Sequence, residues 1–123
     1  MLRAIILVAL FLTQNVTPYK GYAVHYSPGL MERVANKRGL EQAECMISSP
    51  LTNDIGAIII VESEWGTMAC QVTDVSQPRH RKAQLRTKTY VEFNFEAAKK
   101  MCNITKVAEK PRTACPITIY IPS

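Results

Sequence analysis

The chain has 123 residues, which is enough for one domain and too few for two. Hydrophobic residues make up 47% of the chain and charged residues 20%, a composition that excludes an intrinsically disordered protein, a collagen and a coiled coil. The formal net charge of +5 favours anionic partners, because net charge acts on association and solubility and not on the fold.

The first residues have the pattern of a secretory signal peptide. One arginine precedes an unbroken apolar run over residues 4–12. This run is too short for a membrane-spanning helix, which takes about 20 residues, and it suits the central region of a signal peptide. We therefore expect a leader over residues 1–19, cleaved between Gln14 and Ala23, and a secreted domain over residues 20–123 without a membrane span. The alternatives are an N-terminal core strand and an uncleaved anchor.

The first half of the domain is predicted to form short strands and one helix. Residues 20–26 form a first strand, which ends at a Ser-Pro-Gly turn. Apolar residues at helical spacing predict a helix within residues 30–39, with the glycine at its end as the stop signal. Residues 44–47 form a short strand, and the strongly β-forming residues 57–61 form the next one.

A β-hairpin is predicted at the centre of the chain. Glu64-Trp65-Gly66 forms its tip, and a strand with alternating side chains returns over residues 68–73. The polar segment over residues 74–88 is predicted to be a loop. Residues 89–93 then form another strand.

The last elements complete a mainly β pattern. Residues 95–101 are predicted to form one or two helical turns, with Asn94 as the N-cap. Residues 117–121 form the last strand, between two prolines. Several short strands separated by frequent turns predict a small β-barrel or sandwich.

Four cysteines agree with an exported protein. An even number behind a signal peptide indicates two disulfides, which allow three pairings. We expect Cys45–Cys70 and Cys102–Cys115, because each pair is local in the sequence. The alternative is four buried free thiols in a cytosolic protein. Because the chain has no C-x-x-C pair and only two histidines, we expect neither a metal site nor a cofactor.

An ordered set of stretches resembles a known family. The stretches are Gly21-Tyr22-Ala23-Val24-His25-Tyr26-Ser27-Pro28-Gly29, Met31-Glu32-Arg33-Val34-Ala35, Cys45, Ile55-Gly56, residues 58–61, Cys70-Gln71-Val72-Thr73-Asp74, Val91-Glu92-Phe93 and Ala97-Ala98. In this order they resemble RlpA-like double-psi β-barrel domains, whose barrel is shared by expansin N-terminal domains, barwin-like proteins and one endoglucanase family. The resemblance covers about Lys20 to Met101, with residues 117–121 as a closing strand. It implies a small six-stranded double-psi β-barrel with one or two short helices.

Asp74 is the residue that this resemblance singles out. The matching aspartate of the family acts on glycosidic bonds, in hydrolysis or in lytic cleavage of peptidoglycan. Such chemistry needs a proton donor for the leaving oxygen and usually a second group as base or nucleophile. The candidates for the second group are Asp54, Glu62, Glu64 and Glu92, of which Glu92 matches the family's second acidic position. The alternative is that Asp74 caps the following turn.

Two departures from the family's pattern bear on catalysis. Many RlpA-type enzymes follow the aspartate with Arg-Gly-Pro, whereas Asp74 is followed by Val75-Ser76-Gln77-Pro78. The second acidic position holds Glu92 where the family has an aspartate. These departures affect the expected activity more than the expected fold, because function depends on the site.

The strongest charge feature is a basic segment without acidic residues between Val75 and Val91. It contains Arg79, His80, Arg81, Lys82, Arg86 and Lys88. Such a segment can hold an acidic polymer such as a wall polysaccharide, a nucleic acid or a membrane surface, and the alternative is a solvated loop. We do not expect nucleic acid, because aromatic residues are not interleaved with the basic ones.

Aromatic residues are the candidates for stacking on sugar rings. They are Tyr22, Tyr26, Trp65 and Tyr90. The alternative for each is a partly buried position in a small core. Together with the basic segment, they give a set of expected substrate-binding residues. The set is Tyr26, Trp65, Arg79, His80 and Arg81.

Two main functions remain open. The first is a secreted, monomeric, non-catalytic barrel that binds cell-wall polysaccharide, another anionic extracellular polymer or an extracellular partner. The second is a glycan-cleaving enzyme of the lytic transglycosylase or endoglucanase type, with Asp74 as general acid. A defence or effector protein of barwin type is a third. A second carboxylate within about 5 to 9.5 Å of Asp74 favours hydrolysis, and an Asp74 occupied by hydrogen bonds favours binding.

Overall fold

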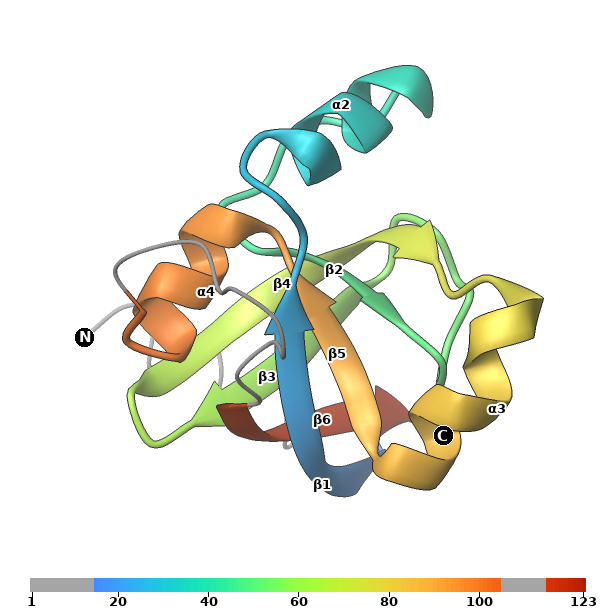
Figure 1. Cartoon of the computed structure of the whole chain (residues 1–123), viewed down its shortest axis with the longest axis vertical. Helices are drawn as coiled ribbons and strands as arrows, with labels where there is room; N and C mark the ends of the chain where they lie inside the picture. The colour runs from blue at the N-terminus through green and yellow to red at the C-terminus, as the bar shows by residue number, and fades with distance from the viewer. Residues whose placement is uncertain (1–14, 105–114) are drawn as a thin grey trace.

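The computed structural model describes residues 15–104 and 115–123, and six strands in this part of the chain form a closed barrel (Figure 1). Around the barrel the strands follow the order β1-β5-β2-β4-β3-β6. The strands are β1 (Val16–His25), β2 (Met46–Ser49), β3 (Ile58–Ser63), β4 (Gly66–Val75), β5 (Thr89–Phe93) and β6 (Cys115–Pro122). The mainly β, six-stranded barrel expected from the sequence is confirmed.

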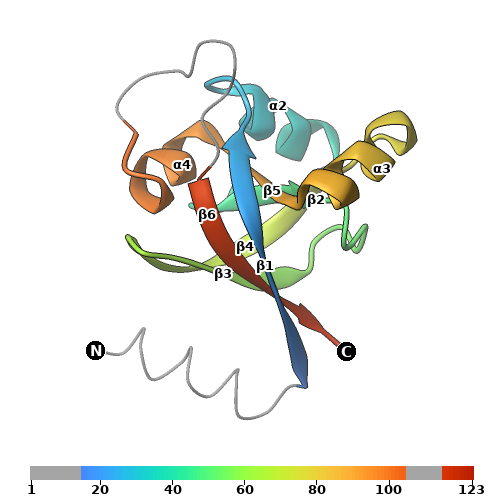
Figure 2. The ribbon, with the colours of Figure 1, turned by 60° about the horizontal axis from the view of Figure 1, so that its bottom comes forward.

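The barrel sheet is mixed, and three helices lie in its longer connections. The pairs β1–β5 and β2–β4 are parallel, and the other neighbouring pairs are antiparallel. The helices are α2 (Leu30–Lys37), α3 (Pro78–Thr87) and α4 (Phe95–Met101). They lie on the same side of the barrel (Figure 2). None of the helices within residues 15–104 and 115–123 is long and apolar enough to cross a membrane.

Alternate residues of the strands fill the barrel interior. Val91 and Phe93 of β5 and Ile117 and Ile119 of β6 are buried in one hydrophobic cluster. They lie inside because successive side chains of a strand point to opposite faces. Burial of each such side chain stabilises the fold by about 1.5–3 kcal/mol. The alternation that predicts strands in the sequence therefore also supplies the core.

Two disulfides cross-link the barrel and its connections. The bonds are Cys45–Cys70 and Cys102–Cys115, which confirms the expected pairing. The first joins the residue before β2 to the middle of β4, and both of its cysteines are fully buried. The second joins the residue after α4 to the start of β6. Two disulfides in a small domain are typical of an oxidising compartment.

Several elements follow their local sequence signals. β5 and α4 have the expected bounds, residues 89–93 and 95–101. β3 and β4 form the expected hairpin, in which Ser63 pairs with Gly66 around the predicted tip. The strand expected from Lys20 begins earlier, at Val16, because this part of β1 pairs with β6. The apolar run of the expected leader lies outside the described residues.

The structure corrects the prediction for the polar segment over residues 74–88. It was predicted to be a loop, but residues 78–87 form α3, so the described residues contain three helices instead of one or two. Pro78 occupies the first helical turn, where its missing N–H costs nothing, and Ala, Gln, Leu, Arg and Lys follow as good helix formers. The prediction failed because no residue of α3 is buried, so the segment has no apolar stripe to reveal its period.

Asn94 is the N-cap residue of α4, as predicted, but its side chain makes no capping hydrogen bond. Its Oδ1 instead accepts a hydrogen bond from the Met46 N–H at 2.9 Å, and its Nδ2 donates to the Glu44 carbonyl at 3.2 Å. The buried amide therefore fastens the start of β2 to the end of β5.

α2 is held over the barrel by a small second cluster. Met31 and Ala35 are fully buried on one face of the helix, against Met46 of β2. The helix ends at Lys37, and Gly39 follows the C-cap residue with a φ of 68°, in the left-handed region that glycine adopts without strain. This ending places Arg38, the C-cap residue, beside the end of β4.

Candidate functional site

A groove of about 560 Å³ lies between α2, α3 and the ends of β2, β4 and β5. We call it the α2–α3 groove. The polar and charged residues that line it include Tyr26, Arg38, Asp74, Arg79, Gln84 and Glu92. Its volume falls within the range of about 300–1,000 Å³ that is usual for ligand sites.

Strand register brings two carboxylates into this groove. Ser48 of β2 pairs with Asp74 of β4 on one side and with Glu92 of β5 on the other. Paired residues of neighbouring strands point to the same face of a sheet. Asp74, Ser48 and Glu92 therefore form one row, and all three line the α2–α3 groove.

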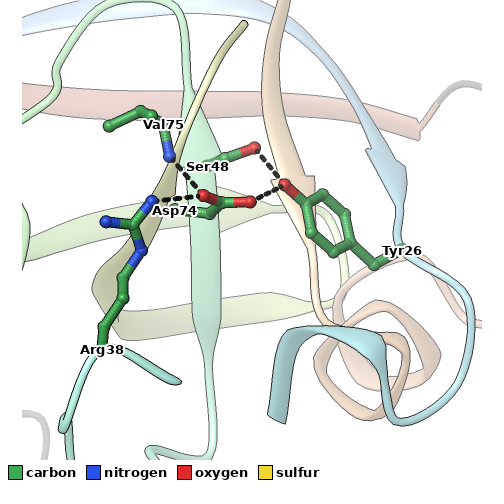
Figure 3. A network of polar contacts seen from close by, with 5 residues as sticks. All are labelled: Tyr26, Arg38, Ser48, Asp74 and Val75. Carbon is green, nitrogen blue, oxygen red and sulfur yellow. Dashed lines mark hydrogen bonds and ion pairs between the residues drawn. The ribbon is translucent and has the colours of Figure 1, made fainter. Parts of the chain in front are cut away.

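The Asp74 carboxylate is the centre of a hydrogen-bond network (Figure 3). Tyr26 Oη donates to Oδ2 at 2.8 Å. Oδ1 accepts from Arg38 Nη2 and from the Val75 backbone N–H, both at 2.9 Å. The side chain of Asp74 is 21% exposed and that of Arg38 is 36% exposed, so the ion pair borders the solvent. Both carboxylate oxygens are thus occupied by donors from three parts of the chain.

Tyr26 connects this network to the groove floor. Its backbone N–H donates to the Phe93 carbonyl at the end of β5, and its hydroxyl also lies 3.4 Å from Ser48 Oγ. Burial raises the pKa of the Tyr26 hydroxyl above its ordinary range, and the hydrogen bond and negative charge of Asp74 raise it further. The hydroxyl therefore keeps its proton at neutral pH and acts as a fixed donor.

Glu92 is held by α3. Gln84 Nε2 donates to Glu92 Oε1 at 3.1 Å, which ties the helix to β5 inside the groove. Gln84 Oε1 and Ser76 Oγ are buried and make no hydrogen bond with the described residues. Solvent does not reach these two atoms, so a molecule in the groove would meet the carboxylates of Asp74 and Glu92 and the exposed side chains around them.

The expected site residues do not all meet. Tyr26, Arg79, His80 and Glu92 line the α2–α3 groove with Asp74. Arg81 lines a smaller neighbouring hollow of about 250 Å³, which also includes Ser76 and Pro78. We call this hollow the Arg81 depression.

Trp65 and the other candidate carboxylates lie elsewhere. Trp65 is 53% exposed at the β3–β4 turn, outside the α2–α3 groove. Glu62 and Glu64 line a separate groove of about 580 Å³ beside β1 and β6, and Asp54 does not line the α2–α3 groove. Among the four candidate partners of Asp74, only Glu92 shares its groove.

Sequence reasoning missed Arg38, Ser48 and Gln84. Arg38 lies 36 residues from Asp74 along the chain, so no local pattern joins them. Ser48 was assigned to the end of a strand without a role, and Gln84 was hidden in a helix that was predicted to be a loop. The one available signal was the helix-forming composition of residues 78–87.

No metal-binding constellation is visible in the described part of the chain. Residues 15–104 and 115–123 contain no group of three or more His, Cys, Asp or Glu side chains that could hold a metal ion.

Comparisons with protein-family models, with curated proteins and with solved structures give no significant match to this chain.

Proposed function

We propose that this protein is a secreted RlpA-like double-psi β-barrel that binds a cell-wall or other extracellular polysaccharide in the α2–α3 groove without cleaving it. The resemblance of the sequence to that family supports the barrel type. The two disulfides and the leader pattern support export. The observation that carries the binding function is the arrangement of donors around Asp74.

All contacts to the Asp74 carboxylate come from donors. Tyr26, Arg38 and the Val75 N–H together occupy both oxygens. A general acid must itself donate a proton to the leaving oxygen of the glycosidic bond. A carboxylate that accepts three hydrogen bonds is suited to holding Tyr26 and Arg38 in place. Asp74 is therefore a structural anchor of the groove.

The groove has the functional groups that a saccharide needs. Glu92 accepts hydrogen bonds from sugar hydroxyls, and Arg79 donates to sugar oxygens. Tyr26 adds a partly buried aromatic ring with a fixed hydroxyl. A small number of polar groups placed in one groove is typical of a ligand-binding site.

Glycan cleavage is the second candidate. It is favoured by one observation, the presence of two carboxylates, Asp74 and Glu92, in one groove. In that case Asp74 would be the general acid and Glu92 the base or nucleophile. The three donors on Asp74 argue against it.

A sedimentation assay separates the two functions. The purified protein is incubated with insoluble peptidoglycan, cellulose and chitin, the pellet is assayed for protein and the supernatant for released sugars by mass spectrometry. We expect protein in at least one pellet and no released sugars. Glu92→Gln should weaken this binding about tenfold, the size expected when a hydrogen bond to a charged group is lost. Glu62→Gln, which removes a carboxylate outside the groove, is the matched control and should bind as the native protein does.

Released products would reverse the assignment. Anhydro-sugars or new reducing ends that disappear in Asp74→Asn would establish an enzyme. Absence of the protein from every pellet would contradict the binding function. Thermal unfolding of each variant shows whether a loss of binding reflects a loss of folding.

A further inference from the structure

α3 is a helix that the core does not require. None of its residues is buried, and the apolar Leu85 is 39% exposed. The helix touches the barrel through polar contacts, which are the Gln84–Glu92 hydrogen bond at 3.1 Å and a Thr87–Thr89 hydroxyl pair at 2.8 Å. Most helices in proteins owe their stability to a packed apolar face. Burial of an apolar face therefore does not explain why α3 lies beside the groove.

The charges of α3 are of one sign and largely unpaired. The helix carries Arg79, Arg81, Lys82 and Arg86 and no acidic residue. In the part of the chain that the structure describes, Arg81, Lys82 and Arg86 make no ion pair. Other cations of the molecule do find partners, since Lys99 pairs with Glu96 and Lys100 with Glu44. Uncompensated cations close together raise the local concentration of anions.

The first turn of α3 contributes residues to two neighbouring hollows. Arg79 lines the α2–α3 groove, and Arg81 lines the Arg81 depression. Both hollows include Val75 and Ser76, so they adjoin each other. A ligand several sugars long that spans both hollows would meet a guanidinium in each.

The α2–α3 groove also contains a hydrogen-bond acceptor close to α3. Glu92 lines the groove, and its Oε1 accepts a hydrogen bond from Gln84 Nε2. A carboxylate has several lone pairs, so a sugar hydroxyl can donate to Glu92 as well. An anionic group has no proton to donate and is suited to the arginines.

We infer that the ligand is an acidic polysaccharide, whose hydroxyl groups donate to Glu92 in the groove and whose anionic groups contact the cations of α3. This inference rests on the proposed saccharide-binding function and adds the charge of the polymer. Carboxylate and sulfate groups share the required chemistry, and Arg side chains bind both through paired N–H donors.

The test compares polymers that differ in charge. Binding of the purified protein is measured by isothermal titration calorimetry with polygalacturonate, with its carboxyl-reduced neutral counterpart and with dextran sulfate, which carries sulfate groups and no carboxylates, at two salt concentrations. The triple variant Arg79→Gln, Arg81→Gln, Lys82→Gln removes three charges from α3 and keeps good helix formers. The matched control, Lys20→Gln, Arg33→Gln, Lys37→Gln, removes three exposed charges that line neither hollow.

The expected result is tighter binding of at least one acidic polymer than of the neutral one, weakening as salt rises. The α3 variant should lose about tenfold in affinity for that polymer, as expected from three surface charges of modest strength, and the control should lose less than threefold. If polygalacturonate binds and dextran sulfate does not, the anionic group is a carboxylate, and the reverse result assigns it to sulfate.

Four outcomes would overturn the inference. Equal binding of neutral and acidic polymers would leave the proposed function standing and remove the role of α3. An equal loss in the control variant would assign binding to net charge. Equally tight binding of double-stranded DNA would show that the polymer need not be a saccharide. If neither these polymers nor the three insoluble ones bind, the proposed function fails together with the inference.

Discussion

At the scale of single residues, Tyr26 is the group whose ionisation reports on the site. Burial raises the pKa of its hydroxyl above the ordinary value of 10.0, and Asp74 raises it further. When the pH rises above the ordinary value of 10.0, the unfolded chain loses the Tyr26 proton while the folded protein keeps it. The folded state then binds more protons than the unfolded state, so the free energy of unfolding falls as the pH rises. We expect this fall to begin near pH 10, and Tyr26→Phe to remove part of it.

Urea unfolding between about pH 8 and 11 measures this effect, because it covers the range in which an ordinary tyrosine titrates. Part of the fall should remain in Tyr26→Phe, since the pKa of Tyr120 is also raised by burial and by its hydrogen bond to Glu62. Tyr22→Phe, which changes an exposed tyrosine outside the α2–α3 groove, is the control. The same pH profile in Tyr26→Phe and in the native protein would show that the Tyr26 proton is not linked to folding.

At the scale of the elements, two helices show what the sequence predicts and what it does not. α2 was predicted because apolar residues recur at helical spacing, and Met31 and Ala35 form its buried face. α3 has no buried residue, so the same criterion assigned it to a loop. The strands resemble α2 in this respect, because their alternate side chains point into the barrel interior. Prediction from periodicity therefore succeeds where an element meets the core and fails where it serves only the surface.

The N-terminal part of β1 leads to a prediction about stability and processing. Residues 16–19 pair with β6, and the ring of Tyr19 packs edge-on against Tyr90 with 5.9 Å between ring centroids. A chain that begins at Lys20 should be less stable than one that begins at Asn15 by about 2 kcal/mol, the value expected for a lost aromatic pair and its burial. Thermal unfolding of the two chains measures the difference.

A variant separates packing from strand pairing in this experiment. Tyr19→Ala in the longer chain removes the ring and leaves the backbone pairing with β6 intact. Sequencing of the N-terminus of the exported protein adds an independent result, and we expect the mature chain to begin at or before Val16. Equal stability of the two chains, or a mature N-terminus after Tyr19, would show that the first residues of β1 are dispensable.

At the scale of the whole molecule, the site is a product of topology. Asp74 and Glu92 come together because β2 lies between β4 and β5, an order that follows from closure of the barrel. The resemblance to a known family indicated both positions in the sequence. It contained no information on Arg38 or Gln84, which reach the same groove from helices in separate connections. The barrel thus follows from local patterns, and the groove follows from contacts between distant segments.

The two disulfides of this barrel should differ in how they open. Cys45 and Cys70 are fully buried in the core, whereas Cys102 is partly exposed beside Cys115. Thiol–disulfide exchange requires access of the attacking thiolate to a sulfur atom. In the folded protein, dithiothreitol should therefore reduce Cys102–Cys115 first, and Cys45–Cys70 only when the barrel unfolds.

Timed alkylation followed by peptide mass spectrometry measures this order. Removal of either bond should lower the free energy of unfolding by about 3 kcal/mol through loss of loop closure. The double substitution Cys45→Ala, Cys70→Ala should cost more than Cys102→Ala, Cys115→Ala, because it also leaves a cavity in the core. Labelling of all four cysteines at one rate would mean that reduction follows global unfolding in both cases. The order of reduction thus tests whether Cys102 and Cys115 become accessible to the reductant while the barrel stays folded.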